Sequence, residues 1–137
     1  MHTLTSAEVF GKNQSTVLVV EDNEDNLIYL AHALNMFGYN SITTQDSRES
    51  LTLALQHQPD LIILDIKMPN LSGIDLFYML KCDWLTRYIP VIAVTALAKE
   101  QEKQLILDVG FKDYLVKPFY LEDLRQAIYS NILCASE

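Results

Sequence analysis

Three short apolar runs most strongly limit what this 137-residue chain can fold into. They are Thr16–Val20, Leu61–Leu64 and Val91–Val94, and almost every residue in them is aliphatic. Runs this short and this apolar are typical of strands that are buried on both faces of a parallel sheet. We therefore expect these three segments to be the central strands of one sheet.

The stretches between these runs repeat their apolar residues with the spacing of amphipathic helices. We expect Asp25 to lie near the start of the first helix, Asp46–Glu49 to form a capping box for the second, and Ser72 to cap the third. Glycine accepts the left-handed backbone that ends many helices, so Gly38 and Gly110 mark two helix ends. The expected apolar faces are Leu27, Leu30, Ala31, Leu34 and Phe37; Leu51, Ala54 and Leu55; Ile74, Leu76, Phe77 and Leu80; Leu105, Ile106 and Val109; and Leu121, Leu124, Ile128 and Ile132.

Two further β-prone runs, Tyr39–Thr44 and Tyr114–Val116, complete a strand-helix alternation that repeats five times. Such alternation predicts an α/β fold with a doubly wound, five-stranded parallel sheet. The two extra runs are shorter or more polar than the other three, so they suit the edge strands of the sheet. With right-handed crossovers between parallel strands, this arrangement gives the strand order 2-1-3-4-5. We expect one domain over residues 16–133, with residues 1–15 and 134–137 as tails.

The composition excludes several classes of function. The net charge of −8 argues against direct nucleic-acid binding, which needs a basic patch. No apolar run reaches the roughly 20 residues that span a bilayer, and the N-terminus lacks a signal-peptide pattern. The two cysteines, Cys82 and Cys134, lie far apart and are expected to be reduced thiols. We therefore expect a cytoplasmic protein with no membrane contact.

Polar side chains follow four of the expected strands at the point where each strand ends. They are Glu21 and Asp22, Asp65, Thr95 and Lys117. Because the carboxyl ends of parallel strands meet at one edge of a sheet, we expect these side chains to lie close together.

Three carboxylates at one place repel one another and take up protons unless a cation intervenes. Mg²⁺ suits such a site because it is a hard ion that binds one or two carboxylates together with water and phosphate oxygens. Lys117 can pair with Asp65 or with an incoming phosphoryl oxygen, and Thr95 offers a hydroxyl donor to another such oxygen. The sequence therefore indicates phosphoryl transfer with a carboxylate nucleophile.

With these residues in place, the chain resembles a receiver domain of the two-component response-regulator family over roughly Thr16 to Leu133. The resemblance implies the flavodoxin-like receiver fold. Glu21 departs from the family pattern, where Asp is more usual, although it keeps the charge. The resemblance depends on Glu21–Asp22, Asp65 with Met68–Pro69 and Gly73, Thr95–Ala96, and Lys117–Phe119.

The resemblance implies a role for each residue at the strand ends. Asp65 accepts a phosphoryl group from a phosphohistidine on a histidine kinase or a histidine phosphotransfer protein. Glu21 and Asp22 hold Mg²⁺ or Mn²⁺ together with Asp65, and the backbone carbonyl of Lys67 completes the metal site. On the same grounds the bond between Lys117 and the following proline is expected to be cis.

The resemblance also implies a switch. Thr95 and Lys117 bind the phosphoryl oxygens, and Tyr114 is the aromatic residue that turns inward when Thr95 moves. The surface that changes, formed by the helix 99–109, the strand 114–116 and the helix 121–131, binds a downstream protein and is compatible with a homodimer. The domain is regulatory rather than an enzyme, and Lys67 and Leu97 predict slow self-dephosphorylation because neither can act as a base.

Four alternatives remain open from the residues. The chain could be a receiver excised from a larger hybrid kinase. A phosphatase of the haloacid-dehalogenase type needs a second Asp where Lys67 stands. A nucleotide- or flavin-binding module needs a Gly- or hydroxyl-rich loop after the first strand, where this chain has Glu21–Asp25 instead. A scaffold that keeps only the fold would not need the acids, Thr95 or Lys117.

Overall fold

The sheet has the predicted topology. The computed structural model describes residues 14–96 and 99–136, so residues 1–13 of the expected tail over residues 1–15, and Leu97, lie outside the described residues. Five parallel strands are hydrogen-bonded in the order β2-β1-β3-β4-β5, which confirms the predicted order 2-1-3-4-5. The strands are β1 (Thr16–Val20), β2 (Asn40–Thr44), β3 (Leu61–Asp65), β4 (Val91–Thr95) and β5 (Asp113–Val116).

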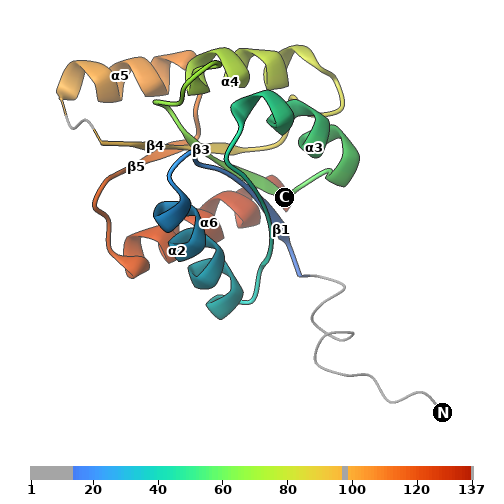
Figure 1. Cartoon of the computed structure of the whole chain (residues 1–137), viewed down its shortest axis with the longest axis vertical. Coiled ribbons are helices and arrows are strands. Elements are labelled where there is room, and N and C mark those ends of the chain that lie inside the picture. The colour runs from blue at the N-terminus through green and yellow to red at the C-terminus, as the bar shows by residue number, and fades with distance from the viewer. Residues whose placement is uncertain (1–13, 97–98, 137) are drawn as a thin grey trace.

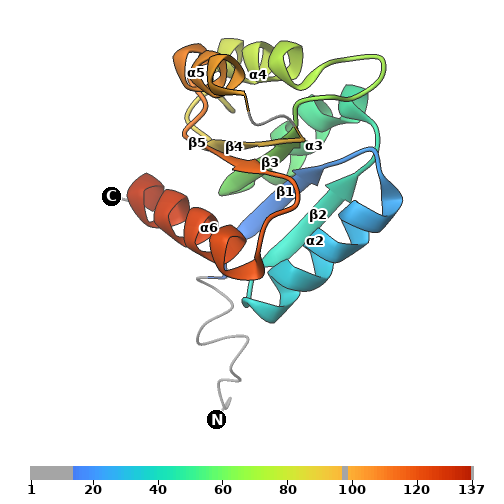
Figure 2. The same ribbon diagram turned by 90° about the vertical axis from the view of Figure 1, so that its left-hand side faces the viewer.

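Helices cover both faces of this sheet, as Figures 1 and 2 show. The helices α2 (Glu24–Met36) and α6 (Leu121–Ser136) pack on one face. The helices α3 (Ser50–His57), α4 (Gly73–Cys82) and α5 (Glu100–Val109) pack on the other, and a 3₁₀ turn, η2 (Ser47–Glu49), precedes α3. No helix in the described ranges is long and apolar enough to cross a bilayer.

The core consists of two layers that share the central strands. Val17 and Val19 of β1 pack toward α2 and α6, whereas Leu18 and Val20 pack toward α3, α4 and α5. The same division holds in β3, because successive strand side chains point to opposite faces. All five residues of β3 and of β4 are buried, which explains why these strands read as unbroken apolar runs.

One of the predicted helix starts is confirmed, and the other is wrong in detail. Asp25 lies in the first turn of α2, as predicted, and the cap itself is Asn23, whose Oδ1 accepts a hydrogen bond from the backbone N–H of Asn26 at 3.0 Å. Asp46 forms no capping box, since its own N–H donates to Thr44 Oγ1 at 3.1 Å and is not available to Glu49. Asp46 instead caps η2 by accepting from the N–H of Arg48 at 2.9 Å.

Other helix ends agree with the prediction. Ser72 caps α4 by accepting from the N–H of Asp75 at 3.2 Å. Gly38 and Gly110 follow α2 and α5 with φ angles of 91° and 122°. The helix α6 reaches Ser136, beyond its expected end at Asn131.

Two predicted core positions are exposed. Leu105 is 56% exposed and Leu121 is 39% exposed, whereas Ile106 of α5 is buried. Each helical residue is rotated about 100° from the one before it, so a helix that turns Ile106 toward the sheet turns Leu105 away from the sheet. These exposed leucines belong to the outer surface of α5 and α6.

Candidate functional site

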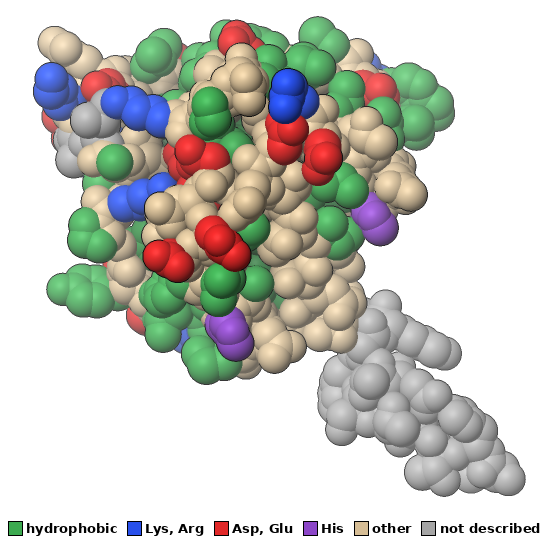
Figure 3. Space-filling model, viewed as in Figure 1, with side chains coloured by type: hydrophobic (Ala, Val, Ile, Leu, Met, Phe, Trp, Pro, Cys, Tyr) green, Lys and Arg blue, Asp and Glu red, His purple; other side chains and the backbone are tan. Residues whose placement is uncertain are grey.

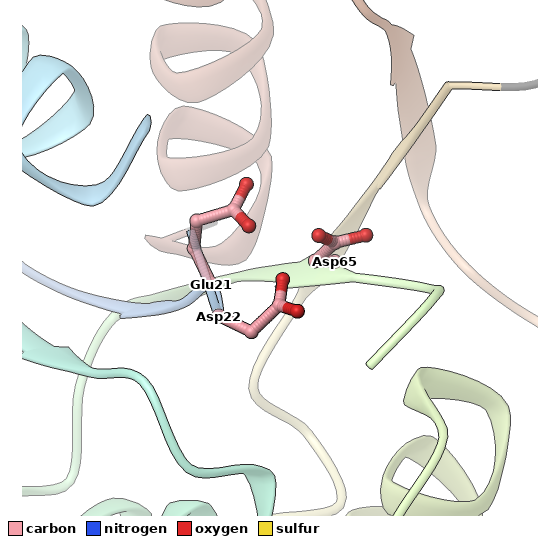
Figure 4. Close-up of side chains that lie close together, drawn as sticks. All are labelled: Glu21, Asp22 and Asp65. Carbon is pink, nitrogen blue, oxygen red and sulfur yellow. The ribbon is translucent and has the colours of Figure 1, made fainter. Parts of the chain in front are cut away.

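Three carboxylates meet at the ends of β1 and β3. Glu21 and Asp22 directly follow β1, and Asp65 is the last residue of β3. These strands are neighbours, with Val20 opposite Leu64, so the residues that follow lie side by side. One carboxylate oxygen from each of the three residues lies within 4.8 Å of the others. Figure 4 shows the three side chains turned toward a common space at this edge of the sheet.

The carboxylate of Glu21 is almost completely buried, at 1% exposure. Its Oε2 accepts a hydrogen bond from the N–H of Asn23 at 3.2 Å, and its Oε1 lies 2.8 Å from the ammonium of Lys117. A buried charge needs such partners, because burial removes the water that would otherwise solvate it. Asp22 is exposed, so the two acids after β1 have different environments.

Asp65 is also buried, and it has partners from two elements. Its Oδ1 accepts from the backbone N–H of Lys67 at 3.1 Å, and its Oδ2 accepts from Lys117 Nζ at 3.2 Å. The first bond fixes the turn after β3 over the carboxylate, which brings the backbone of Lys67 to the rim of the site. The side chain of Lys67 itself is exposed.

Lys117 reaches the carboxylates from the end of β5. Its backbone N–H donates to the carbonyl of Thr95 at 2.8 Å, and its bond to Pro118 is cis, as predicted. Burial alone would lower the pKa of this lysine. The hydrogen bond that Lys117 donates to Glu21, with the negative charges of Asp65 and Glu21, outweighs burial and raises the pKa of Lys117 above its ordinary value. The ammonium therefore stays charged in the folded protein.

Thr95 and Tyr114 lie on the adjacent strands at the same side of the site. Thr95 ends β4, is 2% exposed and stands opposite Val116 of β5. A cavity of about 250 Å³ next to Thr95 separates the turn after β3 from α5. Tyr114 stands opposite Ala93, is half-buried and packs against the core under α4 and α5. The cavity is lined by Ile66, Lys67, Ile74, Thr95, Glu102, Leu105 and Ile106.

Gly73 closes the loop that leads away from Asp65. Its N–H donates to the carbonyl of Ile66 at 3.0 Å, so the start of α4 lies directly against the end of β3. A Cβ at this position would lie 2.6 Å from the carbonyl oxygen of Asp65 and 2.7 Å from Cα of Ile66. Only glycine fits this contact without moving backbone, which gives a physical reason for Gly73 in the motif.

Sequence reasoning missed two features of this site. It paired Lys117 with Asp65 or with phosphate, whereas the ammonium also binds Glu21 and is closer to it. It also missed a cavity of about 520 Å³ beside α2, where the rings of Tyr29 and Phe119 lie 6.3 Å apart. Two sequence signals could have indicated these features. Glu21 stands at a strand end, and its side chain is one methylene longer than that of Asp. Aromatic residues stand on α2 and directly after Pro118, at Tyr29 and Phe119. The cavity is lined by Glu21, Asn26, Tyr29, Leu30, Lys117, Pro118 and Phe119.

The donor set decides what the site can bind. The three clustered groups offer only carboxylate oxygens, which are hard ligands that suit Mg²⁺ and Mn²⁺ rather than soft metals. A cation there and the ammonium of Lys117 together would neutralise the oxygens of an incoming phosphoryl group. The arrangement therefore suits phosphoryl chemistry at a buried carboxylate.

Comparison with known proteins gives one consistent result. A sequence profile described as response regulator receiver domain matches residues 17–129. The polar-differentiation response regulator DivK of Brucella anthropi is 39% identical over 117 residues, which cover 85% of this chain and 95% of DivK. The structure of the chemotaxis protein CheY4 of Vibrio cholerae is similar with a TM-score of 0.80 and 29% identity, covering 85% of this chain and 98% of that chain.

One similar structure was solved with a metal ion. It is the receiver domain of the sensor histidine kinase PA1611 from Pseudomonas aeruginosa, with a magnesium ion coordinated in its active site cleft. Its TM-score is 0.80 at 28% identity, covering 87% of this chain and 98% of that chain.

Proposed function

Because the chain belongs to the response regulator receiver family, whose members are regulatory domains of phosphorylation-based signalling, we propose that Asp65 is its phosphorylation site. The phosphoryl group comes from a phosphohistidine on a histidine kinase or a histidine phosphotransfer protein. Phosphorylation then changes a surface that binds a downstream protein. The observation that carries this proposal is the buried Asp65 carboxylate, held between the N–H of Lys67 and the ammonium of Lys117 at the strand ends.

Mg²⁺ or Mn²⁺ is the proposed cofactor. Asp22, Asp65 and Glu21 would hold the ion directly or through water, and the carbonyl of Lys67 lies in a turn that is fixed over Asp65. When bound, the ion neutralises negative charge on the oxygens of the transferring group. The magnesium in the cleft of the PA1611 receiver supports the choice of metal.

The residues of this chain divide the transfer step among them. One oxygen of Asp65 attacks phosphorus, a P–O bond forms and the P–N bond to the donor imidazole breaks. The leaving nitrogen keeps the electron pair and takes a proton from solvent, so the products are an acyl phosphate and a neutral histidine. Lys117, which donates to Asp65 in the free protein, would pair with a phosphoryl oxygen once the acyl phosphate has formed. Thr95 donates its hydroxyl to a second phosphoryl oxygen.

The donor protein is expected to dock beside α2. The 520 Å³ cavity adjoins Glu21 and Lys117, and Tyr29 and Phe119 give its wall an aromatic surface. Ile28 and Tyr29 of α2 are exposed, so apolar side chains are available for contact around this cavity. A phosphohistidine presented there would approach Asp65 from the open edge of the sheet.

The downstream partner is expected on the surface of α5, β5 and α6. Movement of Thr95 toward the phosphate would leave space for the ring of Tyr114, which is only half-buried at the edge strand. Five large apolar side chains are exposed on α5, on α6 and just before α6, and they suit a protein-binding surface, including one for a homodimer. They are Leu105, Leu107, Tyr120, Leu121 and Tyr129.

Chemical phosphorylation tests the proposal. The protein is incubated with acetyl phosphate and Mg²⁺, and the modified residue is mapped by mass spectrometry and by release with hydroxylamine, which cleaves acyl phosphates. We expect one phosphoryl group on Asp65, its loss in Asp65→Asn, and its retention in Asp123→Asn, where the exposed aspartate in the first turn of α6 serves as control. Modification of another residue, or steady phosphate release well above one per protein, would contradict the proposal and favour a phosphatase.

A further inference from the structure

A second apolar surface lies at the opposite edge of the sheet. We call it the loop patch, and it consists of Tyr78, Met79, Trp84, Leu85 and Tyr88, all of which are exposed. Trp84 is 71% exposed and Tyr88 is 81% exposed. These residues come from the second half of α4 and from the loop to β4, which enters the sheet at the amino ends of the strands. Figure 3 shows apolar side chains gathered at the upper right, over the end of α4 and this loop.

The loop that displays Trp84 and Tyr88 is firmly held. Thr86 is fully buried, and its Oγ1 donates to the carbonyl of Leu80 at 2.6 Å. The carboxylate of Asp83 accepts from the N–H of Leu85 at 2.9 Å. The exposed aromatic rings are therefore carried by an ordered backbone, which lowers the entropy that a partner must offset when it binds.

Three cations lie beside the loop patch, although the whole chain has a net charge of −8. Lys81 Nζ donates to the carbonyls of Arg87 and Ile89 at 2.8 and 3.0 Å, and the guanidinium of Arg87 lies 5.1 Å from the centre of the Tyr88 ring. Lys112 lies at the same edge, because its N–H donates to the carbonyl of Val91 at 3.1 Å. Burial and the charge of Lys112 lower the pKa of Lys81, as expected for neighbouring cations.

The loop patch also has a hollow beside it. A shallow, open groove of about 390 Å³ between α3 and α4 is lined by Leu51, Tyr78, Met79, Cys82 and Asp83. A bulky apolar side chain can lie in such a groove, whereas a lipid surface would meet mainly the protruding residues. Asp83 brings one negative charge to this hollow, and its carboxylate accepts from the N–H of Leu85, whereas three cations, Lys81, Arg87 and Lys112, lie at the same edge, so positive charge is in excess there.

We propose that the loop patch binds an acidic segment of a partner protein, with a bulky apolar side chain of that segment inserted between α3 and α4. The charge complementarity comes from Lys81, Arg87 and Lys112, and the apolar contact comes from Trp84 and Tyr88. Large exposed aromatic residues beside arginine are the side chains that contribute most to protein interfaces. The surface is remote from Asp65, so this binding does not require phosphorylation and goes beyond the receiver function.

Peptide selection on the whole chain tests this inference. A displayed library of random peptides is selected on the wild-type protein and, in parallel, on Tyr88→Ala. An enriched peptide is then synthesised and titrated into the protein. Trp84 is the chain's only tryptophan, so a blue shift of its emission reports directly on binding at the loop patch. Fluorescence anisotropy of the labelled peptide gives Kd for variants that lack this signal.

Matched variants separate the loop patch from other exposed residues. We expect Trp84→Ala and Tyr88→Ala to raise Kd about tenfold or more. Met36→Ala, which removes a large exposed apolar side chain at the end of α2, should leave Kd within about twofold. Arg87→Glu with Lys112→Glu should also weaken binding, whereas Lys99→Glu at the start of α5 should not. Circular dichroism checks that each surface variant is folded.

The alternatives give distinct results, and each would overturn the proposal. One is a selection that yields no peptide dependent on Tyr88, or only peptides without acidic residues. Another is a blue shift of Trp84 emission with phosphatidylserine vesicles but not with the selected peptide, which would indicate an anionic lipid surface. A shift that depends on protein concentration alone would indicate a second copy of the chain. Acetyl phosphate labelling of Tyr88→Ala should match wild type, so this test and the test of Asp65 can fail independently.

Discussion

The ammonium of Lys117 lies 2.8 Å from Oε1 of Glu21, a side chain that is only 1% exposed. This contact is shorter than the 3.2 Å between the same ammonium and Asp65. A carboxylate this deeply buried is strongly destabilised unless a counter-charge lies next to it. Lys117 is therefore shared between two carboxylates, the buried Glu21 and the proposed phosphorylation site Asp65. We infer that Glu21 positions the ammonium of Lys117.

Replacing Glu21 should change the acidity of Lys117. Glu21→Gln keeps the shape but removes one negative charge and one charged hydrogen bond, so the pKa of Lys117 should fall relative to wild type. The pKa is measured by NMR after reductive ¹³C-methylation of lysines. Glu24→Gln, at an exposed position in the first turn of α2, is the control and should leave it unchanged. An unaltered Lys117 pKa in Glu21→Gln would contradict the role assigned to this pair.

The raised pKa of Lys117 also has a consequence for stability at high pH. A lysine whose pKa is raised on folding binds its proton more tightly in the native state. The stability from this ion pair is therefore fully present below the ordinary lysine value of 10.5 and is lost as pH rises through the higher folded-state pKa. In urea titrations between pH 9 and 12, Glu21→Gln should lose less stability with rising pH than wild type does.

Magnesium should stabilise the folded protein. A ligand that binds only the native state adds about 3 kcal/mol at a free concentration one hundred times its Kd. We expect Mg²⁺ to raise the melting temperature of wild type, EDTA to reverse this, and Asp22→Asn to weaken the response. Asp25→Asn changes another exposed acid nearby and should respond like wild type. An equal response of Asp22→Asn and wild type would remove Asp22 from the metal site.

Gly73→Ala should destabilise the fold at the site itself. The new Cβ would lie within 2.7 Å of backbone atoms of Asp65 and Ile66, which cannot rotate away as a side chain can. Overpacking of this kind costs about 1–3 kcal/mol, measured by urea denaturation. Gln101→Ala, on the exposed surface of α5, should stay within about 0.5 kcal/mol of wild type. Full stability of Gly73→Ala would mean that the loop after β3 moves easily.

Thr86→Val should loosen the loop after α4. Valine has the same shape but leaves the carbonyl of Leu80 without the hydroxyl that now lies 2.6 Å from it. An unsatisfied buried carbonyl costs about 1–3 kcal/mol, whereas Thr86→Ser keeps the donor and should cost less. Thr52→Val, at an exposed position of α3, is the matched control in thermal denaturation. If the Thr86→Val variant proves as stable as the Thr86→Ser variant, the hydroxyl of Thr86 does not hold this loop.

The acyl phosphate on Asp65 should be long-lived. The side chain of Lys67, two residues after Asp65, is exposed, and a lysine side chain offers hydrogen-bond donors but no acceptor that could activate water as a base. We expect the phosphoryl group to persist well beyond seconds in purified protein with Mg²⁺, followed on gels that separate phosphorylated from free protein. Loss within seconds would contradict this expectation.

Much of the fold could be predicted from the order of residues alone. Apolar runs of four or five residues can be satisfied only by burial on both sides, and their alternation with helical patterns leaves few topologies. Parallel strands then bring Glu21, Asp22, Asp65 and Lys117 to one edge, because every strand ends there. The proximity of these side chains thus follows from their positions in the chain, without knowledge of any distance.

Only the tertiary structure decided the contacts that depend on side-chain direction and on neighbouring elements. Whether Asn23 or Asp25 caps α2 depends on which backbone N–H groups are left unpaired, and Leu105 is exposed because Ile106 occupies the side of α5 that faces the sheet. The pairing of Lys117 with Glu21 requires the lysine side chain to extend from the end of β5 past the ends of β4 and β3 to the residue after β1, which no local pattern encodes. The reason is physical: periodicity in a sequence reports which face of an element is buried, whereas ion pairs and exposed patches depend on what lies across from that face.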